Sequence, residues 1–204
     1  MCGIVGIINS TSFDSRESIE LLVSALSHRG PDASGLYVSP GRNVFFGNTR
    51  LSIIDPSPSN NQPFETAKTV IVFNGEVYNH RELRESLKRA GVSFGTEGDT
   101  EVIARGFECW GLDLFRRTKG MYAIAIYEKD SGSVYLARDM FGIKPLYVSQ
   151  TGDELRFASE VKALQARHSY EINHETLFDL MTLGFHVSNN SIFKSVQQVP
   201  PGMV

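Results

Sequence analysis

The sequence has little cysteine and no long hydrophobic run. Its 204 residues include only Cys2 and Cys109, too few for the disulfide framework of a small secreted domain, and this fits a reducing compartment. No segment approaches the roughly 20 apolar residues that span a bilayer, and the N-terminus lacks the basic region of a secretion signal. We therefore expect a cytoplasmic protein without a membrane partner.

The chain also lacks an excess of charge and any recognised pattern of metal ligands. A net charge of −3 provides no basic surface for nucleic acid. The five histidines are scattered, and none pairs with cysteine or glutamate at a spacing typical of a metal site. No glycine-rich phosphate loop occurs either. We expect no nucleic-acid partner, no metal and no cofactor for this domain.

The composition that is present is ordinary for a soluble globular protein, with 41% hydrophobic and 21% charged residues in a length that suits one large domain. Apolar periodicity and turn residues predict strands in adjacent pairs, with helices grouped between them. This order favours an α+β fold of antiparallel sheets with helices packed outside. The predicted strands cover residues 3–9, 35–38, 43–48, 51–54, 69–74, 145–149 and 154–158, plus a hairpin within 120–139, and the predicted helices cover 15–28, 80–90, 100–110, 160–166 and 174–183.

Cys2 offers distinctive chemistry because it follows the initiator methionine. If Met1 is removed, one residue carries both a thiol nucleophile and a free α-amine, and an α-amine with a reference pKa of about 7.7–8.0 can accept the thiol proton. If Met1 is retained, that amine is tied in a peptide bond, and we expect little or no activity. Taken alone, Cys2 favours a buried strand residue, because cysteine is among the most buried residue types.

Nine short motifs follow one another along the chain. They are MCGIVG (1–6), HRGPDASG (28–35), RLSIID (50–55), NQPF (61–64), FNGEVYNHRELR (73–84), GDTEVI (98–103), RDMFGIKPLY (138–147), FASEVKAL (157–164) and VPPG (199–202). In this order they resemble the glutaminase domain of glutamine-hydrolysing asparagine synthetase, a class II glutamine amidotransferase. The resemblance covers essentially the whole chain. Related amidotransferases that make glucosamine phosphate or phosphoribosylamine also begin with Cys-Gly, but they differ at the RLSIID and GIKPLY segments.

The resemblance implies a fold and a mechanism. The fold would be that of the N-terminal-nucleophile hydrolases, with two antiparallel β-sheets sandwiched between helical layers (αββα). Cys2 would attack the side-chain amide carbon of L-glutamine with its own α-amine as base, and the resulting thioester would be hydrolysed to L-glutamate after release of ammonia. The Asn74 side chain and the Gly75 backbone N–H would hold each oxyanion. Without the resemblance, Asn74-Gly75 indicates a tight turn, which is compatible with presenting an N–H.

The substrate-binding residues follow from the same resemblance. Arg50 resembles the arginine that binds the α-carboxylate of glutamine, and a guanidinium suits that bidentate geometry. Asp99 resembles the partner of the α-ammonium, with a contribution from Glu76. Without the motifs, Arg50 would be typical of a surface residue and Asp99 of a helix N-cap. The pocket would also be lined by backbone groups of Leu51, Ile53 and Ile54.

Other residues near these motifs receive structural interpretations. We assign His28 no catalytic role, because the N-terminal amine already serves as the base. Arg29 and Asp32 are interpreted as an ion pair near the site, and Lys144 as a solvated or interface charge. Cys109 lies on a predicted helix and is interpreted as a packing residue.

The resemblance also implies a longer protein. Residues 1–204 would form the glutaminase domain, and residues 192–204 would lead to a C-terminal synthetase domain, whose SGGxDS pyrophosphate-binding motif does not occur in this chain. ATP and magnesium are expected only for that partner domain. The domain would use the ammonia to amidate aspartate or another carboxylate, such as a sugar acid. A homodimer is compatible with the sequence.

Two other functions stay open from the sequence. The domain could be a catalytically silent glutamine-binding or scaffolding module, although the presence of Cys2, Asn74 and the substrate-binding residues argues against silence. It could also be a cysteine-dependent amide hydrolase with a different substrate. Arg50 together with Asp99 argues instead for a free α-amino acid.

Overall fold

The structure is a computed structural model that describes residues 1–9, 15–52, 57–166, 168–185 and 188–204. Within these ranges the strands form a six-stranded sheet, in the order β10-β8-β9-β1-β3-β2, and a four-stranded sheet, in the order β4-β5-β6-β7. The strands are β1 (Gly3–Ile8), β2 (Ala33–Val38), β3 (Val44–Arg50), β4 (Phe64–Glu65), β5 (Thr69–Val77), β6 (Gly120–Glu128), β7 (Val134–Arg138), β8 (Tyr147–Thr151), β9 (Glu154–Ala158) and β10 (Val196–Gln198). The helices are α1 (Ser15–Ser24), α2 (His80–Arg89), α3 (Asp99–Trp110), α4 (Asp113–Arg117), α5 (Val161–Leu164) and α6 (His174–Leu183), with 3-10 turns at Ser27–Arg29 and Pro58–Asn60.

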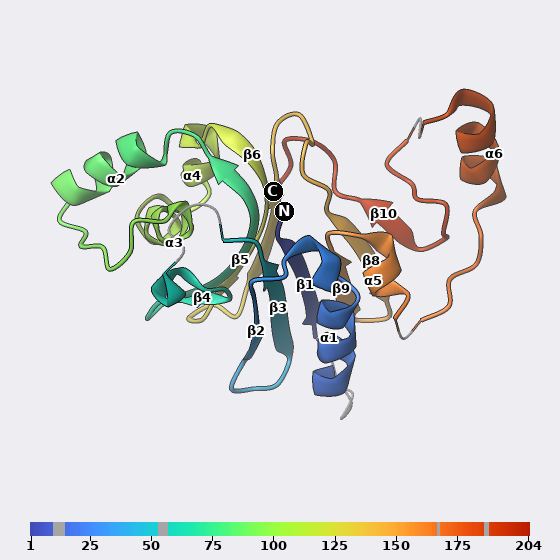
Figure 1. The fold of residues 1–204 in the computed structure, drawn as a ribbon, viewed down its shortest axis with the longest axis horizontal. Helices are drawn as coiled ribbons and strands as arrows, with labels where there is room; N and C mark the ends of the chain where they lie inside the picture. The colour runs from blue at the N-terminus through green and yellow to red at the C-terminus, as the bar shows by residue number, and fades with distance from the viewer. Residues whose placement is uncertain (10–14, 53–56, 167, 186–187) are drawn as a thin grey trace.

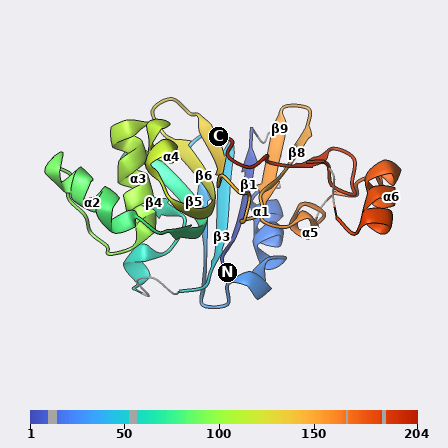
Figure 2. The same cartoon turned by 90° about the horizontal axis from the view of Figure 1, so that it is seen from above.

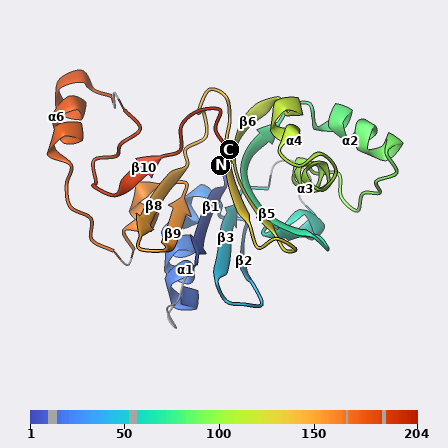
Figure 3. The ribbon, with the colours of Figure 1, turned by 180° about the vertical axis from the view of Figure 1, so that it is seen from behind.

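The two sheets lie face to face, and helices cover their outer sides (Figure 1, Figure 2). Helices α1 and α5 cover the six-stranded sheet, whereas α2, α3 and α4 cover the four-stranded sheet. Helix α6 stands apart at one end of the molecule (Figure 3). None of the helices in the described ranges is long and apolar enough to cross a membrane. This arrangement confirms the predicted α+β class, with two antiparallel sheets between helical layers.

Buried apolar side chains fill the spaces between the layers in three clusters. The cluster between the sheets includes Ile4, Val72, Phe46 and Phe157, and the last two rings meet edge to face with 5.5 Å between their centroids. A second cluster joins the six-stranded sheet to α1 and α5, and a third joins the four-stranded sheet to its helices. The inner strands are therefore buried on both faces, which explains their continuous apolar runs.

Strand alternation decides which residues of β5 reach the space between the sheets. Val70 and Val72 face the opposite sheet, whereas Ile71 and Phe73 face the helices. Asn74 lies on the same face of β5 as Val70 and Val72. Its amide is therefore placed in the gap between the two sheets, where the first residues of the chain also lie.

Strand β1 is held on both sides, between β3 and β9. Gly3 pairs with Thr49 of β3, and Val5 pairs with Ala158 of β9. Gly6 is required by close packing, because a Cβ at this position would lie 2.1 Å from the ring of Phe157. The residue before β1 therefore extends from a rigid base.

The predicted elements are largely present, with shifted ends. The helix predicted over 15–28 ends at Ser24, because the chain then turns toward β3. The approach at Gly30 is so close that a Cβ there would lie 2.3 Å from the Thr49 backbone. The strand predicted over 51–54 is wrong at Leu51 and Ser52, and residues 53–54 lie outside the described part. Three short elements, β4, β10 and α4, were not predicted, because segments of 2, 3 and 5 residues are too short to show a period.

The interpretation of Cys109 as a packing residue is wrong, because its side chain is exposed. The face of α3 that packs on the sheet is centred on Ile103, Phe107 and Trp110. Cys109 directly precedes Trp110, and one residue corresponds to about 100° around a helix, so its side chain points to the flank of that face.

Candidate active site

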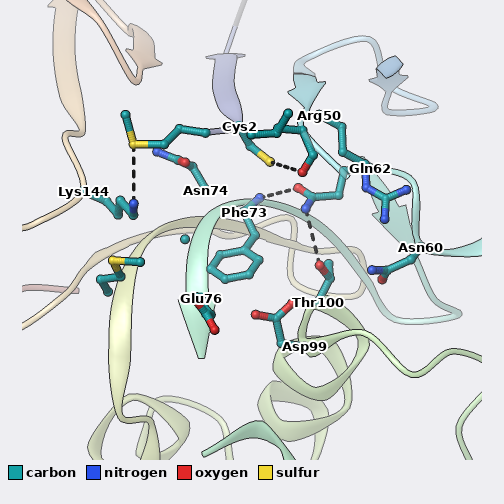
Figure 4. Close-up of a pocket in the computed structure, with 14 residues that line it drawn as sticks. Cys2, Arg50, Asn60, Gln62, Phe73, Asn74, Glu76, Asp99, Thr100 and Lys144 are labelled. Carbon is teal, nitrogen blue, oxygen red and sulfur yellow. Dashed lines mark hydrogen bonds between the residues drawn. The ribbon is translucent and has the colours of Figure 1, made fainter. Parts of the chain in front are cut away.

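A cavity of about 170 Å³ opens where the N-terminus meets the end of β5 and the start of α3 (Figure 4). Sites for drug-sized ligands hold roughly 300–1,000 Å³, so this cavity suits a small metabolite. The predicted residues that line it are Cys2, Arg50, Leu51, Asn74, Gly75, Glu76 and Asp99. The predicted Ile53 and Ile54 lie outside the described residues. The lining residues that were not predicted are Met1, Asn60, Gln62, Phe73, Thr100, Met121 and Lys144.

Cys2 is half-buried directly before β1, and Figure 4 shows its thiol directed into the cavity. The Sγ atom lies 3.8 Å from the carbonyl oxygen of Leu51. The Cys2 carbonyl oxygen accepts a hydrogen bond of 2.9 Å from Arg29 Nε. The backbone of the nucleophile is therefore fixed by a buried side chain, while its thiol faces the space that a ligand would enter.

The Asn74 side chain is a buried donor without a partner. The residue is 1% exposed, and its Nδ2 has no hydrogen-bond partner among the described residues. Nearly all buried polar atoms in proteins are hydrogen-bonded, so an exception calls for an explanation. A donor held ready for a ligand oxygen in the cavity provides one.

Gly75 adds a backbone donor to the same place. Gly75 lies opposite Tyr122 of β6, whose backbone groups are turned to Asp139. The Tyr122 N–H donates to the Asp139 carboxylate at 3.2 Å, and the Tyr122 carbonyl oxygen accepts the Asp139 N–H at 2.9 Å. Gly75 therefore directs its N–H to the other edge of β5, as does Phe73 two residues earlier, which donates to Gln62 Oε1 at 2.6 Å. Position 75 excludes any side chain, because a Cβ would lie 2.1 Å from the carbonyl oxygen of Met121.

Arg50 supplies a cation to the cavity. It is the last residue of β3, on the same strand face as Phe46, and it is 4% exposed. Its Nη1 donates to Asn61 Oδ1 at 2.6 Å and to the Ser57 carbonyl oxygen at 3.1 Å. These bonds fix the orientation of a planar cation, and such a group can bind a carboxylate through two parallel bonds.

Two carboxylates, Asp99 and Glu76, lie close together on one side of the cavity (Figure 4). Asp99 is 4% exposed, and its Oδ2 accepts the Val77 N–H at 3.0 Å. Burial raises the pKa of Asp99 above its ordinary value, and this effect outweighs the opposing influence of the Val77 bond and of His80. A bound ammonium group would offset that cost of burial. Asp99 does not serve as an N-cap, because Gly98 occupies the cap position of α3.

Gln62 connects two walls of the cavity, a role that was not predicted from the sequence. Its Oε1 accepts the Phe73 N–H, and its Nε2 lies 3.4 Å from Thr100 Oγ1. The residue belongs to the NQPF motif, which was the available signal. Asn60 and Met121 also line the cavity, and no pattern around them indicates it.

The interpretation of Lys144 as a solvated or interface charge is wrong. Lys144 is 8% exposed and lines the cavity, with its Nζ 3.6 Å from Met1 Sδ (Figure 4). The preceding loop explains its placement. The Asp139 carboxylate accepts the N–H groups of Ile143 and Lys144, both at 3.0 Å, and Arg138 Nε donates to the Lys144 carbonyl oxygen at 2.8 Å.

The predicted ion pair between Arg29 and Asp32 is also wrong. Arg29 Nη1 bonds Glu160 Oε1 at 2.8 Å, and Asp32 instead accepts the Ser52 N–H at 2.7 Å. The cause is long-range, because β9 pairs with β1 and carries Glu160 to the side of the N-terminus. His28 is turned to the same carboxylate, with its Nε2 2.9 Å from Glu160 Oε1.

A family model described as a glutamine amidotransferase domain matches residues 1–204. The chain belongs to this family. It is a class II glutaminase domain, as the motifs predict. Membership of this family also confirms the predicted enzyme class, a glutamine amidotransferase. Within the described residues, no group of three or more His, Cys, Asp or Glu side chains could hold a metal ion.

This glutamine amidotransferase domain is similar to parts of longer proteins. It is 38% identical to the glutamine-hydrolyzing asparagine synthetase 1 of Bacillus subtilis (strain 168), over 99% of this chain and 33% of that protein. It is 33% identical to a putative asparagine synthetase of Methanocaldococcus jannaschii, over 96% of this chain and 42% of that protein. It is also 31% identical to the amidase chry2 of Gibberella zeae, over 96% of this chain and 29% of that protein. The chain thus spans less than half the length of these relatives.

Solved structures carry the same fold. The glutamine phosphoribosylpyrophosphate amidotransferase of B. subtilis superimposes with a TM-score of 0.69 at 21% identity, over 84% of this chain and 45% of that one. At this identity the likeness speaks for the fold alone. It confirms the predicted N-terminal-nucleophile hydrolase fold for this glutaminase domain.

Proposed function

We propose that the domain hydrolyses L-glutamine to L-glutamate and ammonia through a thioester on Cys2. The observation that carries the proposal is the unpartnered Nδ2 of buried Asn74, which shares a cavity with a thiol, with the cation of Arg50 and with the carboxylate of Asp99. This set offers a nucleophile, an oxyanion donor and a partner for each charged end of a free amino acid.

The proposed reaction proceeds in two halves. With Met1 removed, the α-amine of Cys2 accepts the thiol proton, and Sγ bonds to the amide carbon of glutamine. The oxyanion receives hydrogen bonds from Asn74 Nδ2 and the Gly75 N–H, which stabilise the transition state more than the ground state. The C–N bond then breaks, and ammonia leaves with the proton held by the amine. Water adds to the thioester by the same route, the S–C bond breaks, and glutamate and free thiol result.

Substrate capture is assigned to the charged residues. Arg50 would bind the α-carboxylate, and Asp99 with Glu76 would bind the α-ammonium, while Leu51 contributes backbone groups. The raised pKa of buried Asp99 supports this role, because a bound ammonium group would offset the cost of burying the carboxylate charge. The pairing favours glutamine over amides that lack an α-amine, and it argues against a different amide substrate.

We further propose that the whole protein resembles its relatives in passing ammonia to a C-terminal synthetase domain. That domain would use ATP and magnesium to amidate aspartate, and no cofactor is proposed for the glutaminase domain. Another carboxylate, such as a sugar acid, is the second candidate acceptor. We place the protein in the cytoplasm, and a homodimer is the assembly to test by light scattering.

The test is the intact mass of the protein after incubation with 6-diazo-5-oxo-norleucine, an electrophilic mimic of glutamine. The proposal expects loss of the Met1 mass together with one adduct, and no adduct in Cys2→Ala. A processed chain that hydrolyses no glutamine and gains no adduct would overturn it in favour of a silent binding module. Adduct formation with Met1 still present would contradict the role of the α-amine.

A further inference from the structure

The first residues of β1 are held by side chains and backbone groups from distant parts of the chain. Arg29 Nε donates to the Cys2 carbonyl oxygen at 2.9 Å, and Asn48 Nδ2 donates to the Gly3 carbonyl oxygen at 3.1 Å. The next residue, Ile4, is fixed twice by Ser159, whose Oγ accepts the Ile4 N–H at 3.0 Å and whose N–H donates to the Ile4 carbonyl oxygen at 2.9 Å. The two carbonyl oxygens nearest the thiol therefore each accept a hydrogen bond from a side chain.

Of these donors, the guanidinium of Arg29 is the one that needs support. Its side chain is 8% exposed, and Nη2 is buried without a partner among the described residues. A buried cation is costly unless an anion lies beside it. Glu160 is that anion, since its Oε1 lies 2.8 Å from Arg29 Nη1.

Glu160 is placed and charged for this task. It directly follows Ser159, which is fully buried and bonded to β1, so its backbone position is tied to the strand that bears the nucleophile. Burial opposes its ionisation, but hydrogen bonds from Arg29, His28 and Lys162 lower its pKa to about 2. The carboxylate is therefore ionised throughout the range in which the enzyme would work. His28 and Lys162 approach from the solvent side, with side chains 48% and 51% exposed.

We propose that Glu160 is a positioning residue for catalysis, which orients Arg29 and through it the carbonyl and thiol of Cys2. The proposal rests on the proposed function, because it concerns the geometry of the same nucleophile. Glu160 is not among the residues that line the cavity, so it acts on the attack and not on substrate binding. A misplacement of a reacting group by about 1 Å can cost on the order of 100-fold in rate.

The test compares Glu160→Gln with the matched control Lys194→Met, which breaks an exposed ion pair with Glu171 remote from the cavity. Glutaminase kcat, KM and Tm are measured on processed protein. In Glu160→Gln we expect kcat to fall about 10-fold or more, with KM changed less than about threefold. The control keeps both constants. A change that affects KM alone and leaves kcat at the wild-type value overturns the proposal.

A chemical-rescue experiment separates positioning from a purely structural role. Arg29→Ala should lose activity, and added guanidinium chloride at low concentration should restore part of it, because the free cation can fill the space between Glu160 and the Cys2 carbonyl oxygen. The double variant Arg29→Ala/Glu160→Gln should not be rescued. Equal rescue of both variants would refute the role of Glu160. Failure of guanidinium to rescue Arg29→Ala, a measurement that requires no change at Glu160, would refute it as well.

The two proposals fail in distinguishable ways. If the wild-type chain, with Met1 removed, neither hydrolyses glutamine nor takes up 6-diazo-5-oxo-norleucine, the proposed function fails. If the wild type is active and Glu160→Gln matches it in kcat, only the positioning role fails.

Discussion

Replacing Asn74 with leucine should remove activity without destabilising the fold. Asn74 is 1% exposed, and its Nδ2 has no partner among the described residues, so the fold carries a buried donor that it does not use. Leucine has a similar size and no polar atom. The substitution deletes the donor and leaves the packing space filled.

The two expected effects have opposite signs. Loss of one oxyanion donor costs about 10²–10³ in kcat. An unsatisfied buried donor costs about 1–3 kcal/mol, so its removal should leave the free energy of unfolding unchanged or raise it by up to that amount. For a domain of this length, 1 kcal/mol corresponds to about 2–4 °C in Tm. Water that reaches Nδ2 once Met1 is removed would shift the gain toward zero.

Thr49→Val is the matched control. Thr49 is also buried, at 3% exposed, but its Oγ1 donates to the Leu26 carbonyl oxygen at 3.0 Å. Valine keeps the shape of the side chain and removes this hydrogen bond, so the substitution should lower Tm. The assay is steady-state glutamine hydrolysis, with Tm followed by circular dichroism. The reasoning is refuted if Asn74→Leu lowers Tm as much as Thr49→Val does, or if it keeps kcat within about threefold of the wild type.

The remaining predictions concern Gly75, Asp99 and Glu160. Gly75→Ala places a Cβ 2.1 Å from a backbone oxygen of β6 and should cost about 3 kcal/mol or more, whereas Gly95→Ala, with open space around it, should change Tm little in the same melting experiment. Asp99→Asn should raise KM for glutamine by about 30-fold or more, because it removes the charge opposite the ammonium. Since the folded pKa of Asp99 is raised, the wild type should gain stability as pH falls from that folded pKa toward the ordinary aspartate pKa of about 3.9. Asp99→Asn should lack this gain in urea titrations at a series of pH values. Glu160 has a folded pKa lowered to about 2, so its contribution is full above about pH 4.5 and is lost as pH falls toward 2; acid unfolding of Glu160→Gln that matches the wild type would contradict this.

The local sequence pattern predicts much of this fold because the inner strands are continuous apolar runs. The apolar run of β5 and the periodic face of α3 are visible in the sequence, and the motif residues Asn74, Gly75 and Asp99 lie at the ends of those elements. An element end is where a strand or helix delivers a side chain to a cavity. The predicted residues therefore meet once the elements are placed correctly.

Local pattern fails where a residue's surroundings come from distant pairing. Arg29 finds its anion only because β9 pairs with β1, and no signal near Arg29 indicates Glu160. Lys144 is buried by hydrogen bonds that its own loop makes to Asp139, although lysine is typical of the surface. Cys109 is exposed because it lies one position away from a packed face.

The pairing of Arg29 with Glu160 also determines how late in synthesis the N-terminal strand can be completed. The two residues are 131 positions apart, and synthesis at about 5–20 residues per second separates them by roughly 7–26 s. Throughout that interval β1 has neither β9 beside it nor the carboxylate that steadies its first carbonyl. The N-terminus is then open to an aminopeptidase, and the thiol has no fixed direction of attack. Removal of Met1 in that interval would precede assembly of the site, and under the proposed mechanism a half-made chain would consume no glutamine.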